Sequence, residues 1–66
     1  MKNNIRIERA ILNITQQQLA EQIGVSRQTI NAMESNKYVP STVLALKIAA
    51  LFGKKVEEVF ILEEGD

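Results

Sequence analysis

Hydrophobic residues recur at helical spacing along most of this chain. Ile7, Ala10, Ile11 and Ile14 follow an i, i+3, i+4, i+7 pattern, which predicts that they form the buried face of a first helix. The same spacing predicts three further buried faces, formed by Leu19, Ala20 and Ile23 in a second helix, by Ile30 and Met33 in a third, and by Leu44, Ala45, Ile48, Ala49 and Phe52 in a fourth. Residues 56–60 are predicted to form a short fifth helix.

Polar residues and glycines indicate where these helices begin and end. The candidate N-caps are Thr15 with Gln18 as a capping box, Ser26 and Ser41, and the candidate C-terminal residues are Asn13, Gly24 and Gly53. Residues 35–40 are predicted to be a loop, because Pro40 disfavours helix at the residue before it.

The two ends of the chain differ from its helical middle. Residues 60–62 are apolar and too few for a helix, so they are predicted to be a strand, and residues 2–6 are the matching candidate. Together these elements predict an all-α domain of five helices spanning residues 1–66, to which the ends can add a small antiparallel β-element.

Composition excludes several classes of function. With 66 residues there is room for one hydrophobic core. The chain has no Cys and no His, so we expect no disulfide, no metal site and no cofactor, and without a constellation of acid, base and nucleophile we do not expect an enzyme. Its apolar stretches are far shorter than a membrane span and no signal peptide precedes the first charges, so the expected location is the cytoplasm.

The formal net charge of zero hides an uneven distribution. Residues 1–55 contain all eight basic side chains and three acidic ones, a net charge of +5, whereas residues 56–66 carry five acidic and no basic side chains. A neutral protein is an unusual nucleic-acid binder, but a basic body with an acidic tail is compatible with that function. On charge alone, a solvated tail without a partner is an equally good interpretation.

The segment 16–35 has the pattern of a helix-turn-helix, in which two short helices are joined by a glycine-containing turn. Ala20 is small enough to let the helices approach, Gly24 suits the tight turn, and apolar residues on both sides can fill a shared core. A helical hairpin of another kind would rarely combine these features at these offsets.

The run from Thr15 to Asn31, TQQQLAEQIGVSRQTIN, resembles the Cro/CI (Xre-type) family of repressors, and the later segments KYVPS and LALKIA also match it. The resemblance covers about residues 5–60, and the chain is also similar to a subgroup of very short regulators that includes the cytolysin-operon repressor. It implies a lambda-repressor-like fold and a homodimeric transcription repressor. It also implies that Arg9 and Glu34 form a structural ion pair between the first and third helices.

In a helix-turn-helix the helix after the turn, here the predicted third helix, enters the major groove of DNA, and its exposed polar residues contact base edges. The candidates for base contacts are Arg27, Gln28 and Asn31, with Thr29 as a weaker one for a base methyl or a phosphate. Each could instead contact a phosphate or face solvent. The candidates for phosphate contacts are Gln16, Ser26, Asn36, Lys37 and Tyr38, of which Tyr38 could equally pack within its loop.

Consecutive apolar residues near the C-terminus need cover, which a second subunit can supply. We therefore predict a dimerisation segment at about residues 56–63, with interface residues Leu51, Val59, Phe60, Ile61 and Leu62. The alternative is that these residues complete the monomer's own core.

The expected function is sequence-specific repression through a pseudo-palindromic operator of double-stranded DNA, with regulation by a further protein partner left open. The alternative function is a protein-interaction module, such as an antitoxin-like partner.

Overall fold

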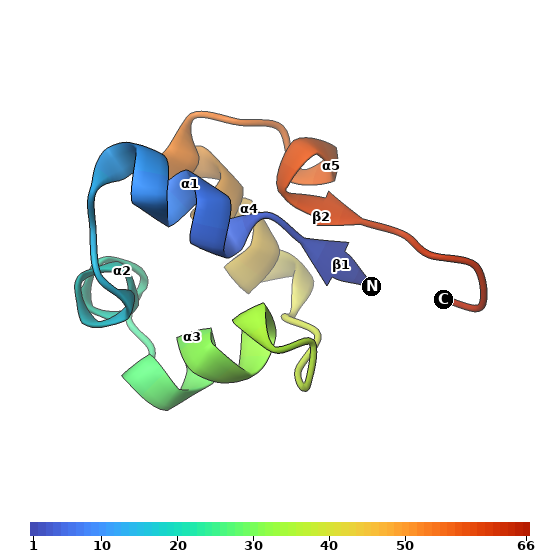
Figure 1. Ribbon diagram of the computed structural model, residues 1–66, viewed down its shortest axis with the longest axis horizontal. Coiled ribbons are helices and arrows are strands. Elements are labelled where there is room, and N and C mark those ends of the chain that lie inside the picture. Colours follow the sequence, from blue (N-terminus) through green and yellow to red (C-terminus); the bar gives the residue numbers. More distant parts are fainter.

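Caps and left-handed residues divide the chain into five helices, as the hydrophobic pattern predicts. The computed structural model describes residues 1–66 (Figure 1). Its elements in chain order are β1 (Lys2–Asn3), α1 (Ile5–Leu12), α2 (Gln16–Ile23), α3 (Arg27–Glu34), α4 (Thr42–Phe52), α5 (Val56–Val59) and β2 (Phe60–Ile61). The predicted all-α fold with a small antiparallel β-element is confirmed.

Side-chain hydrogen bonds fix the starts of α2, α3 and α4. The Thr15 hydroxyl accepts from the Gln18 backbone N–H at 3.0 Å, and the Gln18 side chain accepts from the Thr15 backbone N–H at 2.8 Å, which completes the predicted capping box. Ser26 and Ser41 each accept from the backbone N–H three residues on, at 3.2 Å. These bonds satisfy donors that have no partner within the helix.

The core consists of twelve buried residues, all of them hydrophobic. They are Ile5, Leu19, Ala20, Ile23, Ile30, Met33, Leu44, Ile48, Ala49, Phe52, Val59 and Phe60. The predicted buried faces of α2 and α3 are therefore confirmed, and so is that of α4, where Ala45 is half-buried against the core. No helix is long and apolar enough to cross a bilayer.

The predicted buried face of the first helix is wrong for Ile7, Ala10 and Ile11, whereas Ile14, just after α1, is half-buried against the core. Ile7 and Ile11 are 59% and 68% exposed, and the buried residue of this helix is Ile5. The inward side of α1 also holds Arg9, whose guanidinium is largely covered where it pairs with Glu34. A prediction from hydrophobic spacing places every charged residue on the exposed side of a helix. Because Arg9 in fact points inward, the predicted buried face of α1 was rotated away from the observed one.

The two ends of the chain form a minimal antiparallel sheet. Lys2 is paired with Ile61 and Asn3 with Phe60. The Asn4 backbone N–H extends the ladder by donating to the Val59 carbonyl at 2.8 Å. Both strands are shorter than predicted, because α1 begins at Ile5 and the paired segment ends at Ile61. Figure 1 shows the sheet and both termini at one end of the molecule, with α2 at the other.

Candidate nucleic-acid interface

The helices α2 and α3 pack against each other across a three-residue turn. Gly24 takes the left-handed conformation there with φ of 79°, which a residue with a side chain adopts only at a cost. Ala20 is fully buried at the junction. This arrangement is a helix-turn-helix, in which α3 is held against the body with one face free.

The free face of α3 is polar. Ile30 and Met33 point inward and are fully buried, whereas Arg27, Gln28 and Asn31 are exposed on the outer side. Thr29 is half-buried, and its hydroxyl lies 3.0 Å from that of Ser26. The structure thus brings the three main candidates for base contacts onto one surface and places Thr29 at its edge.

A shallow, open hollow of about 450 Å³ lies beside this surface. Its walls are Ser26, Gln28, Thr29, Ala32 and Tyr38. Tyr38 is exposed, so it does not pack into the core and its ring borders the hollow instead. The hollow combines apolar walls with the amide of Gln28.

The end of α3 is closed by a backbone motif that the sequence pattern did not predict. Asn36 has a φ of 60°, its backbone N–H donates to the Met33 carbonyl at 3.0 Å, and that of Lys37 donates to the Ala32 carbonyl at 2.8 Å. This is a Schellman motif with Asn in the left-handed position. Because both backbone donors are used within the chain, a phosphate contact at this corner is left to the side chains, above all the exposed ammonium of Lys37.

Glu34 is a buried carboxylate with several donors around it. Its side chain is 1% exposed, and Arg9 donates to it twice, from Nε at 2.7 Å and from Nη2 at 3.1 Å. Arg9 Nη1 also donates to the Ile14 carbonyl at 3.0 Å, while the exposed Arg6 lies 3.5 Å from the carboxylate. Burial alone would raise the pKa of Glu34, but the hydrogen bonds from Arg9 and Gln16 outweigh it and hold the pKa below its ordinary value.

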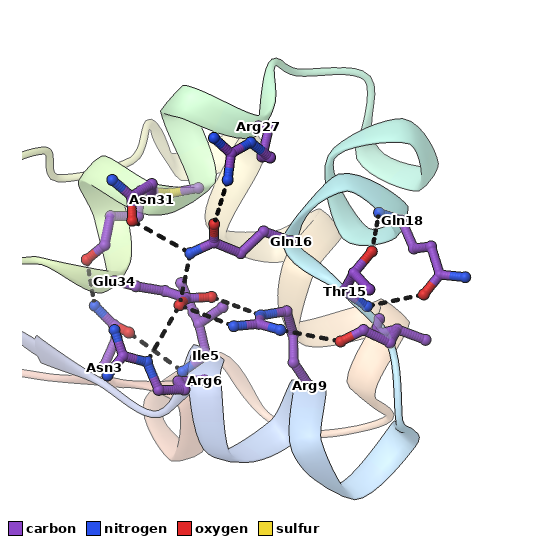
Figure 2. Close-up of polar contacts among 12 residues, drawn as sticks. Asn3, Ile5, Arg6, Arg9, Thr15, Gln16, Gln18, Arg27, Asn31 and Glu34 are labelled. Atoms are coloured by element: carbon purple, nitrogen blue, oxygen red, sulfur yellow. Dashed lines mark hydrogen bonds and ion pairs between the residues drawn. The ribbon is translucent and has the colours of Figure 1, made fainter.

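Gln16 connects this buried pair to the exposed polar face of α3 (Figure 2). Its Nε2 donates to Glu34 Oε1 at 3.1 Å and to Asn31 Oδ1 at 3.3 Å. Its Oε1 lies 3.5 Å from Arg27 Nη1. The side chain that the sequence assigns to a phosphate is therefore engaged inside the protein, whereas its backbone N–H, in the first turn of α2, has no partner within the helix.

The five candidates for a dimer interface fall into two groups. Val59 and Phe60 are buried in the chain's own core, and Leu51 is half-buried against it. Ile61 and Leu62 are exposed, Leu62 to 78%. The alternative of a monomer core thus describes Val59 and Phe60, and surface for a partner remains at Ile61 and Leu62.

Two further residues support the site and were not predicted. The Asn3 side chain in β1 donates to the Met33 carbonyl at 2.8 Å and to Asn36 Oδ1 at 3.3 Å, which ties the N-terminal strand to the end of α3. Arg6 adds a second cation near Glu34. These contacts join residues 28 to 33 positions apart, and no local pattern of the sequence indicates them.

Residues 5–59 match the model of a helix-turn-helix family, HTH_3. The chain belongs to this Cro/CI-type helix-turn-helix family. It is 53% identical over 66 residues to the uncharacterized HTH-type transcriptional regulator MJ0272 of Methanocaldococcus jannaschii, an alignment that covers all of both chains. It is 50% identical over 64 residues to the uncharacterized regulator YgzD of Bacillus subtilis, with 97% of each chain covered. The protein is a transcriptional regulator with a helix-turn-helix DNA-binding domain.

Proposed function

We propose that the protein is a sequence-specific repressor that binds a pseudo-palindromic operator as a homodimer, with α3 in the major groove. The observation that carries the proposal is the outer face of α3, where Arg27, Gln28 and Asn31 are exposed side by side on a helix held rigidly by α2. Arg and amide side chains are the groups that read base edges. The relatives named above come from an archaeon and a bacterium, in which genomic DNA lies in the cytoplasm, so the cytoplasm is the proposed location.

The surroundings of this face support contact with DNA. Lys37 follows α3 and is exposed, so it can reach a flanking phosphate. The one acidic residue of α3, Glu34, is buried and paired, which removes a negative charge from the surface that would meet phosphates. The methyl group of Ala32 in the hollow beside Gln28 suits an A·T pair, because Gln can bond adenine while an apolar group contacts the thymine methyl.

Selection of bound duplexes from a random pool tests the proposal. A specific repressor enriches one sequence with two-fold symmetry and half-sites about 34 Å apart. Arg27→Ala is expected to cost about 1–3 kcal/mol on that operator and to relax specificity at one position. Lys37→Ala is the matched control, because loss of a phosphate contact weakens all duplexes alike and lowers the salt dependence. Equal affinity for operator and scrambled duplex contradicts the proposal.

The dimer is assigned to the exposed end of the chain around Ile61 and Leu62. An apolar residue as exposed as Leu62 gains stability when a second copy covers it. In light scattering at tens of micromolar, the protein is expected to have the mass of two chains, and Leu62→Asp that of one. Ile11→Asp changes another strongly exposed apolar residue, on α1, and is expected to leave the dimer intact. A monomeric wild type overturns this assignment.

The alternative function, a protein-interaction module, is favoured by the exposed apolar residues Ile7 and Ile11 on α1. The face of α3 itself lacks the aromatic anchors typical of protein interfaces, apart from Tyr38 at its border. A chain that selects no duplex but forms a stable complex with a second protein would support this alternative.

A further inference from the structure

The amide of Gln16 lies between a buried carboxylate and two of the side chains that face DNA. In Figure 2 its nitrogen is directed toward Glu34 and Asn31, and its oxygen toward Arg27. The four residues come from α2 and α3, so the contact spans the junction of the helix-turn-helix.

The direction of this amide follows from the chemistry of Glu34. The Glu34 side chain is ionised, because Arg9 forks onto it at 2.7 and 3.1 Å. An ionised carboxylate accepts hydrogen bonds and donates none. Gln16 must therefore turn its NH₂ group toward Glu34, which directs its carbonyl oxygen the opposite way, toward α3's first turn and the guanidinium of Arg27.

The bonds of Gln16 use up its donors. Its two N–H groups have two acceptors within the protein, Glu34 Oε1 at 3.1 Å and Asn31 Oδ1 at 3.3 Å. A phosphate contact by this side chain would have to break one of them. Its oxygen lies 3.5 Å from Arg27 Nη1, a long contact that leaves the guanidinium on the α2 side of the face.

The same contacts fix which atoms Asn31 offers. Its Oδ1 is turned toward Gln16, and Figure 2 shows its Nδ2 pointing away from that contact. Asn reads adenine through both atoms of its amide, donating to N7 and accepting from N6. With the oxygen directed at Gln16, the amide of Asn31 presents a donor to the groove, as the guanidinium of Arg27 also does.

We propose that Glu34, acting through Gln16, turns the donor of the Asn31 amide outward beside the guanidinium of Arg27, which has donors only, so that Arg27 and Asn31 recognise guanine. Guanine offers two acceptors in the major groove, O6 and N7, whereas adenine offers one acceptor and one donor. Gln16 is in this view a positioning residue and not a phosphate contact. The inference rests on the proposed sequence-specific function and adds the base that one part of the site reads.

The first test uses the wild-type protein and its selected operator. The position read by Arg27 is the one at which Arg27→Ala loses discrimination, and we expect a guanine there that is preferred over adenine by about tenfold. Replacement of that guanine by 7-deazaguanine, which lacks the N7 acceptor, is expected to weaken binding about fivefold or more. Selection of adenine at this position overturns the inference and leaves the proposed repressor standing.

The second test removes the amide and keeps the buried ion pair. Gln16→Met has a side chain of similar length and leaves Arg9 paired with Glu34, so the variant is expected to fold, as checked by circular dichroism. Its preference for guanine is expected to fall about fivefold toward that of Arg27→Ala, with affinity for a scrambled duplex within about twofold of wild type. Gln17→Met is the matched control, because Gln17 bonds Glu21 on the exposed side of α2.

The outcomes separate this inference from the proposed function. If Gln16→Met weakens binding to operator and scrambled duplex equally and lowers the salt slope, Gln16 is a phosphate contact and the inference is wrong. It is also wrong if the variant keeps the full preference for guanine. If the wild type shows no sequence preference, the proposed repressor function itself is contradicted. The first selection shows this before any variant is made.

Discussion

At the scale of single residues, the ion pair of Arg9 and Glu34 is the feature on which the site depends. A carboxylate that is 1% exposed is stable only when its charge is met by donors, and Arg9 supplies two at 2.7 and 3.1 Å. The family resemblance implied this pair, and the geometry explains it. The hydrogen bond from Gln16 to Glu34 could not be predicted from the sequence, because it depends on how α1, α2 and α3 pack together.

Arg9→Met is expected to lower the free energy of unfolding by about 3 kcal/mol, because it leaves a buried carboxylate without its main partner. Arg6→Met is the matched control. Arg6 reaches the same carboxylate at 3.5 Å but is 72% exposed, so its loss is expected to cost less than about 1 kcal/mol. Urea unfolding monitored by circular dichroism measures both changes. Equal losses in the two variants contradict the structural role assigned to Arg9.

The same pair predicts a dependence on pH. Glu34 has a lowered pKa in the folded protein, so its pairing contributes stability fully above the ordinary value of 4.5 and loses it as pH falls through the lowered pKa. The difference in unfolding free energy between wild type and Arg9→Met is therefore expected to shrink as pH is taken from about 7 to about 3. Titration of the other carboxylates cancels between the two proteins. A difference that stays constant over this range contradicts the assignment.

At the scale of elements, the sequence was most informative where a helix end has its own local chemistry. The capping box of Thr15, the serine caps and the glycine stops are contacts within a few residues, and all were predicted. Predictions failed where an element's orientation is set from far away. The face of α1 is fixed by the partner of Arg9 on α3. The closing of α3 is a local contact and was missed for another reason, because Asn36 takes a left-handed conformation more typical of glycine.

The turn between α2 and α3 gives an element-scale prediction. Gly24 has φ of 79° and nothing lies within 4 Å of where a Cβ would be, so Gly24→Ala meets backbone strain without a clash. We expect the free energy of unfolding to fall by about 1 kcal/mol, and by less for Gly24→Asn, because Asn tolerates this conformation. Gly65→Ala is the control: Gly65 also has a positive φ, but it lies in the tail and ends no helix. A larger loss at Gly65 than at Gly24 contradicts this account.

At the scale of the whole molecule, the distribution of charge matters more than its sum. The acidic C-terminal tail, residues 63–66, forms ion pairs with the N-terminus. The amine of Met1 lies 3.1 Å from the Asp66 carboxylate and 3.2 Å from that of Glu63. These carboxylates raise the pKa of the Met1 amine. Figure 1 shows the tail beside the N-terminus, at the end of the molecule opposite α2. The negative charge thus lies at a distance from the polar face of α3, and it acts on a ligand of that face through the long-range field alone.

Deletion of residues 63–66 removes three acidic side chains and changes the net charge from zero to +3. Phosphates attract a more positive protein, so affinity for a scrambled duplex is expected to rise several-fold at about 50 mM salt, with a smaller gain at about 200 mM because of screening. The operator carries the same phosphates, so its affinity is expected to rise by about the same factor and the preference for operator over scrambled duplex to stay unchanged. Fluorescence anisotropy measures both affinities.

A full-length variant with Glu63→Gln, Glu64→Gln and Asp66→Asn separates charge from chain length. It carries the same net charge as the deletion and keeps every residue of the tail. Equal gains in non-specific affinity from the two proteins show that the field of the tail is the cause. If only the deletion raises the non-specific affinity, the tail hinders DNA binding sterically. If neither protein binds scrambled duplex more tightly, the tail has no effect on DNA binding. In the first case the acidic end lowers the attraction of the basic part of the chain to DNA of any sequence.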